Sequence, residues 1–176
     1  EVLFDLLIMD SFLWRKVSAL LQAVYAVKNA KEDDVPNKIE EGLYLGSMGA
    51  AYNRSVLKSL NVTYILTVAC SSPPYPTDFT YKVIDVKDTE DTNLAQYFDE
   101  CFDFIDEAKS MGGSVLVHCF AGRSRSVTIV VAYLMKKYGM RVREATAVVR
   151  ARRPMVNPNP GFILQLQNFE ERVRGR

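Results

Sequence analysis

The stretch from Val115 to Gly139 constrains the fold more than any other part of the sequence. A short apolar segment, Val115 to Val117, predicts a buried strand, and a loop containing Gly122 follows it directly. The next stretch, Arg125 to Tyr138, predicts a helix that ends at Gly139. A strand that passes through a short loop into a helix is typical of α/β proteins, whose active sites lie beyond the carboxyl ends of the strands. We therefore expect Cys119 to lie at such an end.

The remaining sequence alternates in the same way. Further short strands are predicted at Leu43–Leu45, Val62–Ala69 and Tyr81–Val86. Further helices are predicted over residues 53–60, from Tyr97 to the glycine pair at 112 and 113, and over residues 142–152 and 162–172. This alternation favours an α/β fold with a central, mostly parallel sheet of about five strands and helices on both faces.

The first part of the chain predicts an extension before the main domain. Apolar residues recur at three-and-four spacing between Asp10 and Val27, which indicates an amphipathic N-terminal helix. A polar, acidic linker then runs to Pro36. We therefore expect a helical extension over residues 10–34 and a catalytic domain over residues 35–176. Residues 1–9 are expected to be an appended remnant or a disordered stretch.

The composition argues against several classes of function. With 48% hydrophobic and 24% charged residues, the chain resembles an ordinary soluble globule. A net charge of +1 gives no overall field for nucleic acid or a membrane surface, and no apolar run approaches the roughly 20 residues that cross a bilayer. Three cysteines, an odd number, are typical of reduced thiols. We therefore expect a cytoplasmic or nuclear protein without nucleic-acid or membrane partners.

The loop after Val117 has the chemistry of a phosphate site. Backbone N–H groups at the start of a helix point toward one place, and the helix dipole adds positive charge there. The guanidinium of Arg125 can bind two phosphate oxygens as a fork. The same positive field stabilises the thiolate of Cys119. The loop is therefore predicted both to bind phosphate and to attack it.

Five residues separate Cys119 from Arg125, and this is the Cys-x5-Arg spacing of the cysteine-based protein tyrosine phosphatases. The full run His118-Cys-Phe-Ala-Gly-Arg-Ser-Arg-Ser126 resembles the loop His-Cys-x-Ala-Gly-x-Ser-Arg-Ser of the dual-specificity subgroup. The resemblance covers roughly residues 35–172. It implies hydrolysis of phosphotyrosine, phosphoserine and phosphothreonine in proteins through a cysteinyl-phosphate intermediate, without cofactor or metal. Mitogen-activated protein kinases are the substrates that it implies.

The resemblance also implies roles for individual residues. Cys119 is the nucleophile, Arg125 binds the transferring phosphate, Ser126 stabilises the thiolate that leaves the intermediate, and His118 orients Cys119. The phosphate-binding set comprises Phe120, Ala121, Gly122, Arg123, Ser124 and Arg125.

An aspartate upstream of the cysteine protonates the leaving group in this family, and Asp88 matches its place. Asp85 and Asp91 are the competitors. Asp85 falls within a predicted strand, and Asp91 lies near the next helix, where a carboxylate also serves as N-terminal charge.

Two other functions remain open at this point. A phosphate-binding or scaffold module that has lost turnover would keep the same loop. A phosphoinositide phosphatase would carry a more basic loop than this one, in which Phe120 occupies a position that a lysine can take.

The predicted N-terminal helix carries Trp14, Leu21 and Val27 as bulky apolar residues, beside several basic ones. This spacing is similar to that of helices that bind calmodulin, and the chain resembles plant dual-specificity phosphatases that bind calmodulin. Packing on the domain and self-association through this face are the alternatives.

Some reactive or charged residues have simpler interpretations. Cys70 and Cys101 are expected to be packing residues, although Cys70 ends a strand that is predicted to lie near Cys119, where a reversible disulfide can form. The basic residues near the C-terminal end are expected to form a solvated helix surface. They are Lys136, Lys137, Arg141, Arg143, Arg150, Arg152 and Arg153.

Overall fold

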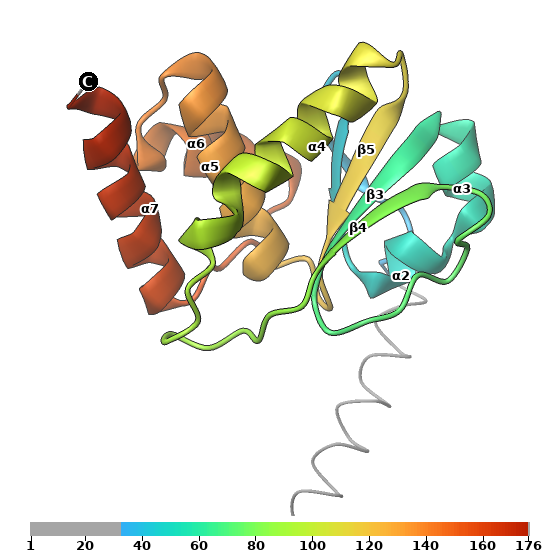
Figure 1. The fold of residues 1–176 in the computed structure, drawn as a ribbon, viewed down its shortest axis with the longest axis horizontal. Coiled ribbons are helices and arrows are strands. Elements are labelled where there is room, and N and C mark those ends of the chain that lie inside the picture. The colour runs from blue at the N-terminus through green and yellow to red at the C-terminus, as the bar shows by residue number, and fades with distance from the viewer. Residues whose placement is uncertain (1–32, 176) are drawn as a thin grey trace, which may run out of the picture.

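The computed structural model describes residues 33–175 (Figure 1). The predicted N-terminal helix, with Trp14, Leu21 and Val27, lies outside the described residues.

A single sheet of five strands runs through the described part of the chain. The strands are β1 (Asn37–Glu40), β2 (Leu43–Gly46), β3 (Val62–Val68), β4 (Thr80–Ile84) and β5 (Ser114–His118). Their order in the sheet is β1-β2-β5-β3-β4. The strands β2, β5, β3 and β4 are parallel, and only β1 is antiparallel to its neighbour. The prediction of a mostly parallel sheet of about five strands is confirmed.

Helices cover both faces of the sheet (Figure 1). The short helices α2 (Met48–Tyr52) and α3 (Arg54–Ser59) pack on one face. On the other face lie α4 (Phe98–Ser110) and α5 (Arg125–Tyr138), and α6 (Val142–Arg152) and α7 (Pro160–Arg174) pack against α5. A 3-10 turn, Ala95–Tyr97, leads into α4.

The larger part of the core lies between the sheet and α5. Every residue of α5 from Ser126 to Met135 is buried, because the sheet, α4, α6 and α7 surround this helix. A helix that is apolar on all sides belongs in the centre of a domain. Gly139 ends it in a left-handed conformation with φ of 66°, as the sequence predicts. The strand β5 is also fully buried, so the strand and the helix that flank the Cys119 loop are both central.

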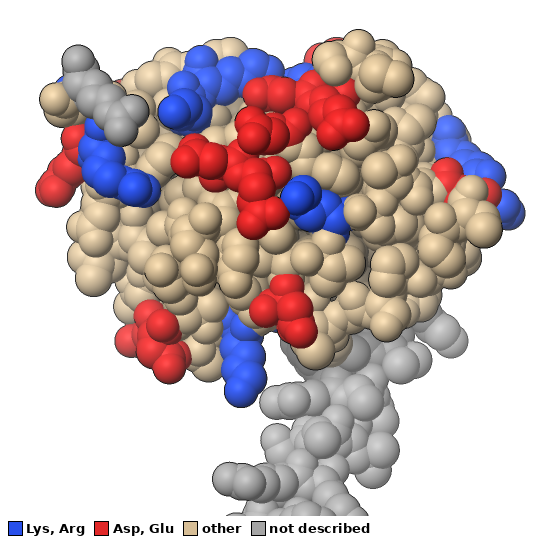
Figure 2. Space-filling view, in the orientation of Figure 1, with Lys and Arg blue, Asp and Glu red and all other residues tan. Residues whose placement is uncertain are grey.

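The surface charge is mixed. Figure 2 shows acidic side chains gathered over α4, where Asp99, Glu100, Asp103, Asp106 and Glu107 are exposed. Among the described residues, no helix combines the length and the apolar character needed to cross a membrane.

Candidate active site

The loop from Cys119 to Ser124 joins the middle of the sheet to the most buried helix. β5 pairs with β2 on one side and with β3 on the other, and it ends at His118. Ser124 is the N-cap of α5, which begins at Arg125. Cys119 is 1% exposed. The nucleophile expected from the sequence therefore lies at the carboxyl end of a central strand and at the amino end of a helix.

Gly122 makes the tight path of this loop feasible. Its φ of 61° lies in the left-handed region, which side chains disfavour. A Cβ atom at this position would lie 2.4 Å from the carbonyl oxygen of Gly46 and 2.7 Å from Nη2 of Arg153. Both the backbone conformation and the lack of space therefore require glycine.

The backbone carbonyls of residues 120–124 all accept hydrogen bonds from protein groups around the loop. In a planar trans peptide, the carbonyl of one residue and the N–H of the following residue point in opposite directions. Because these carbonyls point outward to their donors, the N–H groups of residues 121–125 point to the inner side of the loop. An inward ring of N–H groups at a helix start binds a phosphate. The carbonyl donors are Met48 N for Phe120 (3.0 Å), Arg153 Nη2 for Ala121 (3.0 Å), Arg153 Nε for Gly122 (2.7 Å), Asn157 N for Arg123 (2.7 Å), and Thr128 N and Oγ1 for Ser124 (2.9 Å each).

Two buried side chains define the surroundings of Cys119. The Ser126 hydroxyl donates to Cys119 Sγ at 3.2 Å. Nε2 of His118 lies 2.8 Å from the hydroxyl of Thr67, and its Nδ1 lies 3.3 Å from the carbonyl oxygen of Cys119. Burial lowers the pKa of His118 to about 4, and the nearby Arg125 acts in the same direction. His118 is therefore neutral near pH 7 and is placed to orient the cysteine.

Asp88 lies against the loop. One of its oxygens accepts hydrogen bonds from the Ser124 hydroxyl at 2.7 Å and from Asn159 Nδ2 at 2.9 Å. Its other oxygen lies 3.4 Å from Nε of Arg125, and Nη1 of Arg125 donates to the carbonyl of Val86 at 3.2 Å. The Asp88 carboxyl group and the Arg125 guanidinium therefore share one site.

The two competing aspartates have other surroundings. Hydrogen bonds from the side chain of Thr89 and from its own backbone lower the pKa of Asp91, so this group holds its proton poorly. Asp85 lies beside the Cys70 thiol, and the hydrogen bond between them raises the pKa of Cys70. In the described part of the chain, neither carboxylate pairs with residues 118–126. The geometry favours Asp88 as the proton donor.

Hydrogen bonds join the segment that carries Asp88 to α7. Gln165 accepts from the N–H groups of Leu94 and Ala95 at 2.8 and 2.9 Å, and it donates to the carbonyl of Thr92 at 2.8 Å. Asn159 caps α7 by accepting from Phe162 N at 2.9 Å while it donates to Asp88. Sequence patterns predict no site role for Asn159 or Gln165, because their contacts join segments about 70 positions apart in the chain.

Two expectations about single residues are wrong. Arg153 is 2% exposed and contacts the loop, so it does not belong to the solvated basic surface. Cys70 is exposed, so it is not a packing residue. Cys101 lies in the core, as predicted, and burial raises its pKa to about 12.

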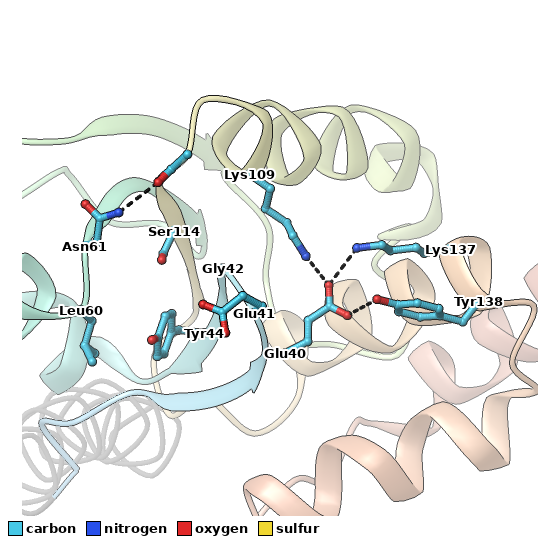
Figure 3. Close-up of a pocket in the computed structure, with 12 residues that line it drawn as sticks. Glu40, Glu41, Gly42, Tyr44, Leu60, Asn61, Lys109, Ser114, Lys137 and Tyr138 are labelled. Atoms are coloured by element: carbon cyan, nitrogen blue, oxygen red, sulfur yellow. Dashed lines mark hydrogen bonds and ion pairs between the residues drawn. The ribbon is translucent and has the colours of Figure 1, made fainter.

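A pocket of about 510 Å³ lies away from this loop, at the amino ends of β2, β3 and β5 (Figure 3). Glu40 accepts from Lys109, from Lys137 at 3.0 Å and from the Tyr138 hydroxyl at 2.5 Å. These charges pair with one another, and no cysteine is among the residues that line this pocket. Within residues 33–175, no three His, Cys, Asp or Glu side chains cluster so as to hold a metal ion.

Comparisons with known proteins agree with this geometry. The sequence profile "Dual specificity phosphatase, catalytic domain" matches residues 43–172. The chain is 59% identical over 160 residues to dual specificity protein phosphatase 1 of Arabidopsis thaliana, covering 90% of this chain and 81% of that protein. It is 46% identical over 137 residues to MAP kinase phosphatase with leucine-rich repeats protein 1 of Dictyostelium discoideum, covering 78% of this chain and 16% of that protein.

Among solved structures, the human tyrosine phosphatase-like serine/threonine/tyrosine-interacting protein has 37% sequence identity and a TM-score of 0.75. The match covers 79% of this chain and 97% of that one. The catalytic-domain profile spans more than half of the chain, and the Arabidopsis relative matches most of both chains. The chain belongs to the dual specificity phosphatases.

Proposed function

We propose that this phosphatase hydrolyses phosphotyrosine, phosphoserine and phosphothreonine in proteins through a covalent phosphocysteine at Cys119. One observation carries the proposal. The carbonyls of residues 120–124 are all bonded outward, so five consecutive N–H groups point inward at the place where Ser126 stabilises the Cys119 thiolate.

In the first step the thiolate attacks phosphorus, and the bond from phosphorus to the substrate oxygen breaks. The loop N–H groups and Arg125 neutralise the charge on the equatorial oxygens. Asp88, 3.4 Å from Arg125, gives its proton to the leaving oxygen, so that a neutral alcohol or phenol departs.

In the second step water attacks the phosphocysteine and gives a proton to Asp88. The bond between sulfur and phosphorus breaks, phosphate leaves and the thiolate returns. The Ser126 hydroxyl, 3.2 Å from the sulfur, stabilises the negative charge as it develops. Both protonation states of Asp88 are thus used in each cycle.

The experiment is hydrolysis of 4-nitrophenyl phosphate and of phosphopeptides by the full chain. Cys119→Ser should abolish turnover. When the wild type reacts with a phosphopeptide that carries a radioactive phosphate, acid quenching should trap the labelled phosphate on the protein. Cys70→Ser is the matched control, because it removes an exposed free thiol outside the loop, and it should stay active. A wild-type chain that binds phosphopeptides without hydrolysing them would support the phosphate-binding module.

We also propose mitogen-activated protein kinases as substrates. The name of the Dictyostelium relative supports this substrate class. Phe120 is 41% exposed at the loop, so the surface there is apolar where an inositol phosphate would need basic groups. Doubly phosphorylated kinase and phosphoinositide vesicles should be compared as substrates at equal concentration. Faster hydrolysis of the lipid would reject the protein assignment in favour of the phosphoinositide alternative.

Calmodulin binding through Trp14, Leu21 and Val27 is a further proposal, supported by the spacing of these residues. Trp14 is the single tryptophan, so its fluorescence reports this segment directly. Calcium-loaded calmodulin should change the emission of the wild type but not of Leu21→Glu. Equal emission with and without calcium would reject the proposal.

A location in the cytoplasm or nucleus is likewise proposed, with the three free cysteines as its support. Microscopy of a fluorescent fusion tests it, and secretion of the fusion would contradict it.

A further inference from the structure

All five N–H bonds of the Arg153 guanidinium have partners in the structure. Nε donates to the carbonyl of Gly122 at 2.7 Å, and Nη2 donates to the carbonyl of Ala121 at 3.0 Å. Nη1 donates to the side chain of Asn37 at 2.8 Å. Asp33 accepts the other two, from Nη1 at 3.0 Å and from Nη2 at 2.6 Å. One side chain therefore joins the phosphate loop to the segment that precedes β1.

The pairing explains how a charged side chain can lie in this place. A guanidinium that is 2% exposed is costly to bury unless its charge and its donors are matched. The carboxylate of Asp33 supplies the opposite charge, and the three neutral acceptors use the remaining donors. The planar shape of the guanidinium also matters, because one edge contacts the Asp33 carboxylate while another contacts the loop carbonyls. A lysine ammonium is a point charge and cannot make both sets of contacts at once.

Asp33 is held in position without the help of Arg153. Its backbone carbonyl accepts from the hydroxyl of Ser47 at 2.8 Å. Ser47 is buried and follows Gly46, the residue whose carbonyl lies directly against Gly122. The backbone of Asp33 is therefore bonded to Ser47 on one side of Arg153, and the loop carbonyls lie on the other side.

We propose that Arg153 is a positioning residue for the phosphate-binding loop and that Asp33 acts on phosphate affinity through it. By binding the carbonyls of Ala121 and Gly122, Arg153 keeps the N–H groups of Gly122 and Arg123 turned toward the phosphate. The stretch immediately before β1 is then part of the catalytic apparatus, although it is distant from the loop in sequence. This inference rests on the proposed role of the loop amides.

The test measures oxyanion binding apart from turnover. Tungstate, which resembles phosphate and is not hydrolysed, is titrated by calorimetry into the full chain, and kcat/KM for 4-nitrophenyl phosphate is measured in parallel. Asp33→Asn removes the charge that holds Arg153. Asp34→Asn is the matched control, because its carboxylate accepts from Asn53 at 3.0 Å and not from Arg153.

Loss of one charge-assisted contact should weaken tungstate binding by Asp33→Asn about tenfold, with a similar fall in kcat/KM. Asp34→Asn should match the wild type in both. Arg153→Lys should lose at least as much as Asp33→Asn, whereas Arg152→Lys, on the exposed neighbouring position, should be unchanged. Adding Asp33→Asn to Arg153→Lys should cause little further loss, because the two residues act through one contact.

Several results would overturn the inference. Unchanged tungstate affinity in Asp33→Asn would show that the pair only supports folding, even if the melting temperature falls. Tighter binding would show that the charge of Arg153 attracts the anion directly. Additive losses in the double variant would separate the two residues. If Arg153→Lys does not fold, the tungstate affinities of Asp33→Asn and its control Asp34→Asn still test the inference. A wild type that binds tungstate without hydrolysing phosphate would reject the proposed function and leave this inference standing.

Discussion

Replacing Gly161 by alanine should displace Asp88, the proposed proton donor, from the rest of the active site. Gly161 lies in the first turn of α7, where the segment that carries Asp88 crosses the helix. A Cβ atom there would lie 2.1 Å from the carbonyl oxygen of Glu90 and 2.7 Å from its carbonyl carbon. Both contacts are with backbone, so no side-chain rotation relieves them. The segment must move by more than about 1 Å to regain ordinary van der Waals separation.

The expected magnitude follows from what this movement does to Asp88. A shift of about 1 Å in a reacting group costs on the order of 100-fold in rate. Alanine in place of glycine inside a helix would by itself stabilise the protein by about 1 kcal/mol. Helix propensity therefore predicts a harmless or favourable change, and only the contact with Glu90 predicts a loss of activity.

The assay compares aryl phosphates whose leaving groups differ in basicity. Gly161→Ala should lose on the order of 100-fold in kcat/KM for phenyl phosphate, which needs the proton, and much less for 4-nitrophenyl phosphate. Asp88→Asn should show the same dependence on the leaving group. Tungstate affinity should not change, because the loop around Cys119 is intact.

Gly175→Ala is the matched control at the other end of α7, where a Cβ atom would meet, among residues 33–175, only the carbonyl of Glu171 at 3.0 Å. It should behave as the wild type. An equal loss on all substrates in Gly161→Ala, or no loss at all, would refute the reasoning that links Gly161 to the donor.

Three further predictions concern the same site. Ser126→Ala should slow release of the phosphocysteine about tenfold, because the sulfur loses its hydrogen bond, and stopped-flow traces should show a burst of product; a trace without a burst argues against this role. Asn159→Asp keeps the acceptor that caps α7 but places a carboxylate beside Asp88; about tenfold lower activity on phenyl phosphate with an unchanged melting temperature is expected, and unchanged activity would contradict it. The pKa of His118 is about 4 in the folded chain and 6.5 in the unfolded chain. As the pH falls, the unfolded chain therefore binds the proton first. The free energy of unfolding should then fall by up to about 3 kcal/mol between pH 6.5 and pH 4. Urea titrations of the wild type and His118→Gln measure this slope, and an equal slope in both would exclude His118 as its cause.

The elements nearest the loop could be predicted from the sequence because their signals are local. The helices α5 and α6 begin and end at the predicted residues. An apolar run that ends at a glycine identifies α5, and the three-and-four spacing of apolar residues identifies α6. The four residues of β1 and the five of α2 were not predicted. Such short segments carry too little periodicity, and their neighbours stabilise them in the folded chain.

The residues of the site also differ in how well the sequence alone predicts them. Cys119, Arg125 and Ser126 lie in one continuous run, so a pattern of residues identifies them. Arg153 looked like one more charge at the end of a basic helix, because its partner Asp33 is 120 positions away in the chain. Contacts of that range leave no local pattern, and only the folded chain shows them.

The outward hydrogen bonds of the loop carbonyls have a consequence for how the motif can be transferred. Their donors come from Met48, Thr128, Arg153 and Asn157, which lie before the loop, within its helix and beyond the next helix. A nine-residue peptide or a graft of residues 118–126 onto another strand and helix would carry the reactive sulfur without these donors. Its carbonyls would be free to rotate inward and repel phosphate. The smallest unit that can catalyse is therefore the assembled domain rather than the motif.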